Sequence, residues 1–428
     1  MNATAFSLKA RLLLPVDRPP LSDAWVTIRE GKICEIGGQP AQQRKDLGDV
    51  ALLPALINAH THLEFSSLAA PLGTPGIHFD DWIREVIRWR IAGDSADNAA
   101  EKRSAAVRQG LAESVRGGST FLGEITSLPT SVAAESSAAL HGFAFWEVLG
   151  LALDRAGELL QGANAFLEQV QQGGWPMHAG LSPHAPYTVG TRLLEQLVSL
   201  SRERHVPLAM HLAETSEELD LLYSASGRLV ELLQELNAWH PAALPPTGAR
   251  PLDYLKLLAN ADRALVVHGN YLDATEIDFA AGHHDNLSVI YCPRTHAYFE
   301  HPNYPLAKMI DHGVNVALGT DSRGSNPDLN MLRELRFAAQ RHPSIARDQL
   351  LRLATLNAAQ AFGMTSSLGS LAPGKQADMI AVPIRPNATA GPHELLLDAE
   401  ADVTRVYRAG KLIFAAGPDA VDATGDSS

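Results

Sequence analysis

The middle of the chain alternates short apolar runs with longer stretches of helical periodicity. The runs include ALLPALINAH, STFLGEI, HAGLSPH, PLAMHLAE, RALVVHG, LSVIYCP and VNVALGT. Helical stretches lie between and after them, for example residues 97–115, 190–204 and 346–361. Strands that alternate with helices form parallel sheets, because each helix carries the chain back to the same edge. About eight such units predict a closed (β/α)8 TIM barrel. A doubly wound open sheet is the alternative, but no GxGxxG turn follows the first run.

The two ends of the chain have a different pattern, with period-two strands around Gly turns. Residues 25–36 predict a hairpin that turns at Glu30-Gly31, and residues 403–414 predict a second one. The run ADMIAVPI precedes the second hairpin and is typical of a buried strand. We therefore expect an α/β protein in two parts. Residues 1–53 plus 366–420 would form a small β-sandwich, and residues 54–365 the catalytic barrel.

Composition narrows the class of protein. The chain has 428 residues, of which 46% are hydrophobic and 19% charged, so it can bury a large core. Its net charge of −13 argues against nucleic acid or an anionic membrane as the main partner. Two cysteines exclude a disulfide scaffold, and no apolar run reaches the ~18 residues of a membrane span. We expect a cytoplasmic protein that acts on a small molecule.

Four of the 17 histidines stand at the ends of apolar runs. His60 and His62 end the first run, and residues two apart on a strand point to the same face. His211 and His268 end two later runs, and Asp321 follows VNVALGT. In a barrel all of these strand ends meet at one mouth, where active sites lie. A polar residue buried there without a partner is costly, so the set predicts a metal site.

The segments NAHTHLEFS, HLAE, VVHGN and LGTDS occur in an order that resembles the amidohydrolase superfamily. The resemblance is closest to its deaminase and chlorohydrolase branch, which includes guanine deaminase, methylthioadenosine/S-adenosylhomocysteine deaminase and the triazine hydrolases. It covers nearly the whole chain and extends to the closing segment SLGSLAPGKQADMIAV. Members are often dimers, so a homodimer is one expectation, although no interface signal in the sequence decides the oligomeric state.

The resemblance implies one divalent metal and two further catalytic residues. The implied metal ligands are His60, His62, His211 and Asp321. His268 would lie beside the bound water, and Glu214 would shuttle protons. Binuclear relatives carry a lysine on the fourth strand, which the run MHAGLSPHAPY lacks, so a single metal is favoured. Zn²⁺ suits three imidazoles and one carboxylate, with Fe²⁺ and Mn²⁺ as alternatives.

These residues would support hydrolytic removal of an amino group from a heteroaromatic ring. A divalent metal makes hydroxide available near neutral pH, and Asp321 can accept the proton of the water. Glu214 would protonate the ring nitrogen and assist the departure of ammonia, for which burial should raise its pKa. The alternative is a purely structural role for Glu214, as a carboxylate at the start of a helix, where the helix dipole stabilises its charge. The same site could open a cyclic amide or displace chloride from a triazine. A non-catalytic scaffold is the least favoured reading, because all the ligand positions are intact.

Several residues near the expected mouth are candidates for substrate contact. They are Glu64, Trp82, His184 and Arg294. Arg294 could clamp a substrate anion, although a surface ion pair is an equal alternative. Arg84 and Arg88 could do the same from an expected helix over the mouth that also contains Trp82, but an amphipathic lid or dimer helix is the favoured alternative there. The arrangement HTHLEFS, a helix containing DWI, and CPRTHAYF is similar to the branch that includes aminodeoxyfutalosine deaminases. An adenine- or guanine-like ring is therefore the expected target, and aminodeoxyfutalosine the leading candidate.

Overall fold

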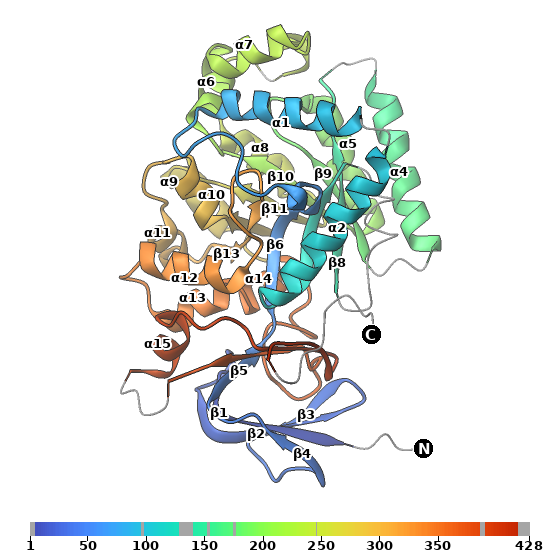
Figure 1. The fold of residues 1–428 in the computed structure, drawn as a ribbon. Helices are drawn as coiled ribbons and strands as arrows, with labels where there is room; N and C mark the ends of the chain where they lie inside the picture. The colour runs from blue at the N-terminus through green and yellow to red at the C-terminus, as the bar shows by residue number, and fades with distance from the viewer. Residues whose placement is uncertain are drawn as a thin grey trace.

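The computed structural model describes residues 5–95, 98–127, 140–151, 155–173, 177–244, 246–385 and 390–417. Two separate sheets organise this α/β fold (Figure 1). The larger sheet has nine strands, in the order β13-β12-β11-β10-β9-β8-β7-β6-β14. Every pair in it is parallel, so the carboxyl ends of its strands meet at one edge.

The strands of the larger sheet are almost wholly buried, as expected where both faces are covered. Their bounds are β6 (Leu56–His62), β7 (Ser119–Thr126), β8 (His141–Val148), β9 (His178–Pro183), β10 (Pro207–Leu212), β11 (Arg263–His268), β12 (Leu287–Tyr291), β13 (Asn315–Leu318) and β14 (Asp321–Ser322). The sheet curls, because β14 pairs with β6 while β13, just before it in the chain, pairs with β12. This curl brings Asp321 next to Thr61, between the two histidines of β6.

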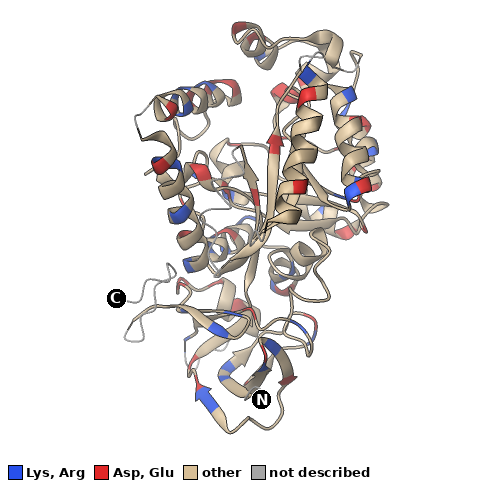
Figure 2. Ribbon diagram, turned by 90° about the vertical axis from the view of Figure 1, so that its right-hand side faces the viewer, with Lys and Arg blue, Asp and Glu red and all other residues tan. Residues whose placement is uncertain are grey.

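Helices cover the outer face of the curled sheet. Their bounds are α1 (Phe79–Asp94), α2 (Ala99–Arg116), α4 (Ala156–Gln172), α5 (Thr191–Arg204), α6 (Ser216–Ser224), α7 (Arg228–Glu235), α8 (Pro251–Leu258), α9 (Ala274–Ala281), α10 (Pro293–Tyr298), α11 (Leu306–Asp311), α12 (Met331–Arg341), α13 (Arg347–Leu353), α14 (Leu356–Ala361) and α15 (Pro392–Leu397), with short 3-10 turns η1 (Leu63–Ser67) and η3 (Pro241–Ala243). Charged residues of both signs are interspersed along these helices (Figure 2). In Figure 1, α1 crosses the end of the sheet far from the terminal strands.

Both ends of the chain build the smaller sheet, in the order β17-β16-β15-β5-β1-β2-β3 with β4 beside β1. Its strands are β1 (Phe6–Leu13), β2 (Leu21–Arg29), β3 (Lys32–Ile36), β4 (Gln43–Asp46), β5 (Val50–Pro54), β15 (Met379–Pro383), β16 (Arg405–Arg408) and β17 (Lys411–Ala415). Both expected hairpins are present, and their turns use positive φ at Glu30-Gly31 and Ala409-Gly410. The sheet has its own apolar core, to which both chain ends contribute.

One expected helix is two in the structure. Residues 346–361 break into α13 and α14 at Ala354-Thr355. The carbonyl of Ala354 accepts a hydrogen bond from Ile57 N of β6, so it is not available to the helix. The Thr355 hydroxyl donates to Leu351 O at 2.7 Å and closes the first helix. A tertiary contact therefore overrides the local periodicity. Of the other expected helices, 190–204 corresponds to α5 and 97–115 to α2, although residue 97 lies outside the described ranges.

No helix in the described part of the chain is both long enough and apolar enough to cross a bilayer.

Candidate active site

Three histidines from two strands form a compact group at the carboxyl edge of the larger sheet. The ring centroids of His60 and His62 are 4.9 Å apart, and those of His60 and His211 are 5.0 Å apart. One ring nitrogen of each lies within 4.8 Å of the others, which is close enough for all three to hold one metal ion. The histidines that end these two strands, His60 and His62 in one and His211 in the other, thus lie close together as expected.

Asp321 completes this group from β14. Its Oδ1 lies 3.5 Å from His60 Nε2 and 3.8 Å from His62 Nε2. The backbone of Asp321 is left-handed, at φ 58°, an unusual conformation that turns the residue at the end of the sheet. Burial opposes ionisation of Asp321, but the close contact with His60 and the surrounding imidazoles outweigh it and hold its pKa well below the usual range.

The donor set fits a divalent metal. Both ring nitrogens of His60 are buried and lack a hydrogen-bond partner within the described residues, which is costly without a ligand. Burial lowers the pKa of His62 and His211 well below the ordinary value, so both imidazoles are neutral, as ligands must be. His211 Nδ1 lies 3.0 Å from the carbonyl of His184, which leaves Nε2 for a metal.

Glu214 and His268 lie beside this group and contact each other. His268 Nε2 is 3.3 Å from Glu214 Oε1, and both side chains are buried. Burial, together with the charges of Asp321 and Glu218, raises the pKa of Glu214 well above its ordinary value. Burial also keeps the pKa of His268 well below 6.5. The pair therefore consists of a protonated carboxyl and a neutral imidazole. The carboxyl of Glu214 can donate a proton into the site.

Two buried glutamates that the sequence analysis missed hold the loops that carry these residues. Glu218 accepts hydrogen bonds from Ala213 N at 2.8 Å and Glu214 N at 3.0 Å. Glu124 accepts from Leu63 N, directly after His62, at 3.0 and 3.1 Å. The sequence signal for Glu218 was a helix-capping pattern, Thr215-Ser216-Glu217-Glu218, at the start of α6. In this pattern the Thr215 side chain caps the helix, and Glu218, three residues later, accepts hydrogen bonds from the backbone before the helix.

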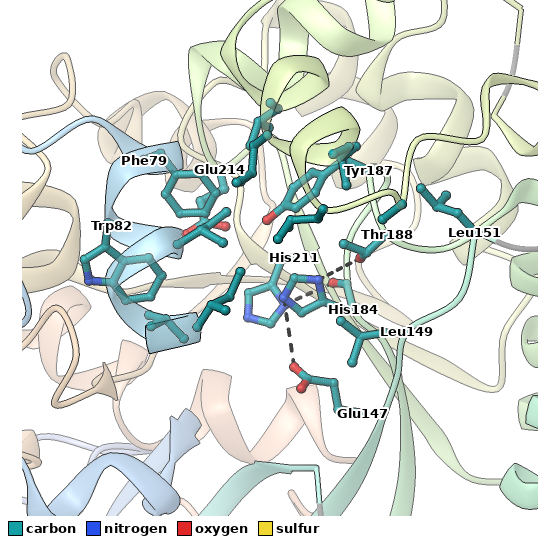
Figure 3. Close-up of a pocket in the computed structure, with 18 of the residues that line it drawn as sticks. Phe79, Trp82, Glu147, Leu149, Leu151, His184, Tyr187, Thr188, His211 and Glu214 are labelled. Carbon is teal, nitrogen blue, oxygen red and sulfur yellow. Dashed lines mark hydrogen bonds and ion pairs between the residues drawn. The ribbon is translucent and has the colours of Figure 1, made fainter. Parts of the chain in front are cut away.

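A cavity of about 480 Å³ opens from the metal group toward α1 and α7 (Figure 3). One face of α1 forms much of the wall through residues at helical spacing, namely Phe79, Trp82, Ile83, Val86, Ile87 and Arg90. Leucines of α7 and of the segment after β8 continue it, so the outer part is mostly apolar. Trp82 is held in place by its Nε1, which donates to Gly324 O at 2.9 Å.

The four expected substrate contacts divide into two groups. Trp82 and His184 line the cavity. In the described part of the chain, Glu64 and Arg294 do not. Glu64 is bonded to Arg90 and to Ser127 Oγ, and Arg294 is bonded to Glu334 and to Asp328 Oδ1. Arg294 is only 11% exposed, so it forms ion pairs inside the fold and does not bind an anion at the mouth of the cavity.

The other two expected arginines are also engaged elsewhere. Arg84 binds Asp80, Asp81 and Glu235, and Arg88 pairs with Glu85. Instead Arg90 and Glu147 belong to the cavity wall. Two sequence features could have identified these residues. Arg90 lies on the same helical face as Trp82 and Val86, and Glu147 is the charged residue near the end of the strand-like run HGFAFWEV.

The fold and the site together define the class of protein. A parallel sheet with three imidazoles and a carboxylate at its carboxyl edge is typical of metal-dependent hydrolases. Residues 51–413 match the Amidohydrolase family. The chain belongs to this family, and it is an enzyme that hydrolyses carbon–nitrogen bonds.

Curated relatives include deaminases of adenine nucleosides. A 5-methylthioadenosine/S-adenosylhomocysteine deaminase of Pyrococcus furiosus is 28% identical over 375 residues, which cover 84% of this chain and 82% of the relative. An aminodeoxyfutalosine deaminase of Deinococcus radiodurans is 29% identical over 341 residues, with coverages of 76% and 78%.

Solved structures show the same fold. The Helicobacter pylori aminofutalosine deaminase in complex with methylthio-coformycin has a TM-score of 0.80 at 23% identity, covering 96% of this chain and 100% of that one. A zinc-bound adenosine deaminase from Xanthomonas campestris has a TM-score of 0.74 at 23% identity, with coverages of 98% and 93%.

Proposed function

We propose that this enzyme is a metal-dependent hydrolytic deaminase that removes the amino group of an adenine-like ring carried by a nucleoside. The observation that carries the proposal is the Glu214–His268 contact beside the His60–His62–His211 group. It joins a buried proton donor to a metal-binding group, which is what hydrolysis at an amino-bearing ring carbon needs. The names of the relatives support the same chemistry.

The proposed metal site holds one ion, most simply Zn²⁺, through three imidazoles and one carboxylate. Its ligands would be His60, His62, His211 and Asp321. The unpartnered nitrogens of His60 support this assignment, and so does the zinc in the adenosine deaminase of similar fold. A divalent metal held there supplies Lewis acidity that lowers the pKa of water toward ~7.

The residues of the chain then divide the proton transfers between them. Asp321, ionised at neutral pH, accepts a proton from the attacking water. Glu214, protonated, donates to the ring nitrogen next to the carbon that carries the amino group. His268 Nε2 hydrogen-bonds the attacking oxygen and keeps it aligned. A carbon–oxygen bond forms, the carbon–nitrogen bond breaks, and the amino group leaves as ammonia with the proton that Asp321 took from water. The remaining proton of the new hydroxyl group returns to Glu214, so the product is a ring carbonyl beside a protonated ring nitrogen and both carboxyl groups regain their starting states.

The cavity supports a nucleoside with an apolar extension. Its outer wall is built of leucine, isoleucine and aromatic side chains, against which a methylthio or aryl group can pack. Trp82 and His184 are the proposed contacts with the ring system. Candidate substrates are 5′-methylthioadenosine, S-adenosylhomocysteine and aminodeoxyfutalosine. Because Arg294 is internally paired, it is not proposed to bind a substrate carboxylate.

We also propose the finer architecture. The larger sheet is a closed eight-stranded barrel in which β13 and β14 are two parts of one strand. Hydrogen bonds from Gly319 N to Tyr291 O and from Thr320 N to His60 O support closure. Residues 1–53 and 366–420 form the sandwich domain, and residues 54–365 the catalytic domain. A homodimer is proposed only because members of the family are often dimers. Analytical sedimentation of the zinc-loaded protein tests it by measuring the mass of the assembly.

The proposed function is tested by measuring ammonia release from the zinc-loaded enzyme. The panel holds adenosine, 5′-methylthioadenosine, S-adenosylhomocysteine, aminodeoxyfutalosine, guanine, a chlorotriazine and a cyclic amide. We expect one adenine nucleoside to react with kcat/KM above roughly 10⁴ M⁻¹s⁻¹. Chloride release or amide opening without any ammonia would replace the proposal by one of the two other reactions.

A further inference from the structure

Glu147 is a buried carboxyl that faces the cavity, and no described residue gives it a hydrogen bond. It follows the apolar part of β8 and belongs to the cavity wall, and its side chain is 3% exposed. Within the described residues its nearest ionisable partners are Arg90 Nη2 and His184 Nε2, each at 4.0 Å, beyond hydrogen-bond distance. Figure 3 shows the contact between Glu147 and His184. A buried carboxyl without a donor is costly, so this one is available to a ligand.

The two neighbours of Glu147 already have other partners. Arg90 is bonded to Glu64 and lies over the ring of Phe65, 5.4 Å from its centroid. His184 Nδ1 lies 2.7 Å from Thr188 Oγ1. These contacts fix the orientation of both side chains, and neither uses an oxygen of Glu147. Glu147 is therefore not simply the counter-ion of Arg90.

The position of Glu147 relates it to the reacting end of the cavity. The ring of His184 contacts both residues, because its Nε2 lies 4.0 Å from Glu147 and its centroid is 5.0 Å from that of His211. A group that contacts Glu147 is thus a substituent of the ring that reacts, one imidazole away from the metal group. Around it the wall is largely apolar, so a polar substituent would find few other partners.

We propose that Glu147, with Arg90 beside it, forms a subsite that binds the hydroxyl groups of the substrate's sugar. This inference rests on the proposed function and names the part of the substrate that the subsite selects. A hydroxyl can donate to the carboxyl and accept from the guanidinium. An anionic group would meet Glu147 while the charge of Arg90 is already balanced by Glu64, and a cationic group would meet Arg90. The subsite therefore selects a neutral diol over a phosphate or a carboxylate.

The protonation of Glu147 is compatible with this role. Burial and the charge of Glu64 raise its pKa to about 7, against the opposing effect of Arg90. Near neutral pH the carboxyl either accepts a hydrogen bond from a hydroxyl or donates one to it. Both forms can therefore bind a diol, whereas a leucine side chain can neither donate a hydrogen bond to a hydroxyl nor accept one from it.

The test compares two substrates on three proteins. The substrates are 5′-methylthioadenosine and its 2′,3′-dideoxy analogue, and the proteins are the wild type, Glu147→Gln and Glu147→Leu. The wild type should prefer the diol by about 10- to 100-fold in kcat/KM, as expected for a hydrogen bond to a charged group. Glu147→Leu should reduce this ratio to about threefold or less, and Glu147→Gln, which keeps one acceptor and one donor, should be intermediate. Glu195→Gln, on the exposed face of α5, is the matched control and should keep the wild-type ratio.

The outcomes separate the subsite from the proposed function. If both compounds are deaminated and the ratio is the same in the wild type and in Glu147→Leu, the subsite is wrong and the deaminase assignment stands. If neither compound releases ammonia, and no other adenine nucleoside of the panel does, the deaminase assignment is wrong. Calorimetric binding of the two compounds to the zinc-loaded proteins then decides the subsite. Equal affinities overturn it, and a preference for the diol that is lost in Glu147→Leu supports it. Bound zinc and circular dichroism verify that each variant is folded.

Discussion

His268 Nε2 lies 3.3 Å from Oε1 of Glu214, although the two residues follow different strands of the sheet. The relationship places a carboxyl of raised pKa against an imidazole of lowered pKa, so the proton resides on the carboxyl. Proton donation from Glu214 is thus available at neutral pH, where an ordinary glutamate is ionised.

Replacing Glu214 by glutamine should abolish proton donation and keep the metal. The amide is similar in size and still fits beside His268, but it cannot deliver a proton. We expect kcat to fall by about 10²- to 10⁴-fold, with zinc content unchanged. Metal analysis of the purified variant and single-turnover ammonia release measure the two quantities. A variant that loses its zinc would show that Glu214 is a ligand or a structural residue.

Removing the metal should lower both activity and stability. An ion that binds only the folded state raises the melting temperature, so chelator-treated protein should melt at a lower temperature than zinc-loaded protein. His211→Asn should bind zinc much more weakly, as measured by chelator competition. His284→Gln, at the surface, is the control and should behave like the wild type. Binding of two zinc ions per wild-type chain would contradict the single-metal site.

Glu218 should make the stability of the protein depend on pH. Burial raises its pKa in the folded state to about 7, against 4.5 for an ordinary glutamate. The folded protein therefore binds this proton more tightly than the unfolded chain. The contribution of Glu218 is fully present below about pH 4.5 and is lost as the pH rises through about 7, a difference of about 3 kcal/mol.

The Glu218→Gln variant isolates this effect. Other groups titrate in the same range, but they remain in the variant and cancel in the comparison. The difference in free energy of unfolding between wild type and variant should change between pH 5 and pH 8, measured by urea denaturation of the zinc-loaded proteins. A difference that is constant over this range would mean that Glu218 does not titrate as its burial implies.

Arg294→Met should destabilise the fold and should not change substrate preference. The guanidinium is 11% exposed and is bonded to Glu334, whose side chain is fully buried, so its removal leaves an uncompensated carboxylate. Breaking a buried pair in this way costs about 3–5 kcal/mol. Chemical denaturation gives the loss, and kcat/KM on substrates with and without a carboxylate gives the preference. A selective loss on the carboxylate substrate would return Arg294 to the role that the sequence first suggested.

The clustering of the candidate metal ligands was predictable because it depends on strand position alone. In a parallel sheet every carboxyl end faces the same side, so His60, His211 and Asp321 had to meet once their strands were recognised. The functions of the arginines were not predictable in this way. Arg294 and Arg90 look alike in the sequence, and only a tertiary contact decides that one is paired inside the fold and the other reaches the cavity wall.

The same limit explains what was missed in the fold and in the substrate site. The break between α13 and α14 depends on a hydrogen bond from β6, and no local pattern contains it. Glu147 lies near the end of a strand as His211 does, but its availability to a ligand depends on the lack of a hydrogen-bond donor among the described residues around it, which only the packed structure reveals.

The pairing of β5 with β15 has a consequence for synthesis on the ribosome. Leu53 of β5 lies opposite Ile380 of β15, so one sheet needs segments from both ends of the chain. After β5 has left the exit tunnel, the edge that pairs with β15 stays open until more than three hundred further residues have been translated. An exposed strand edge is prone to pair with other chains. The nascent chain therefore completes this sheet only near the end of translation, and a truncated product that lacks β15 would be a target for chaperones and proteases.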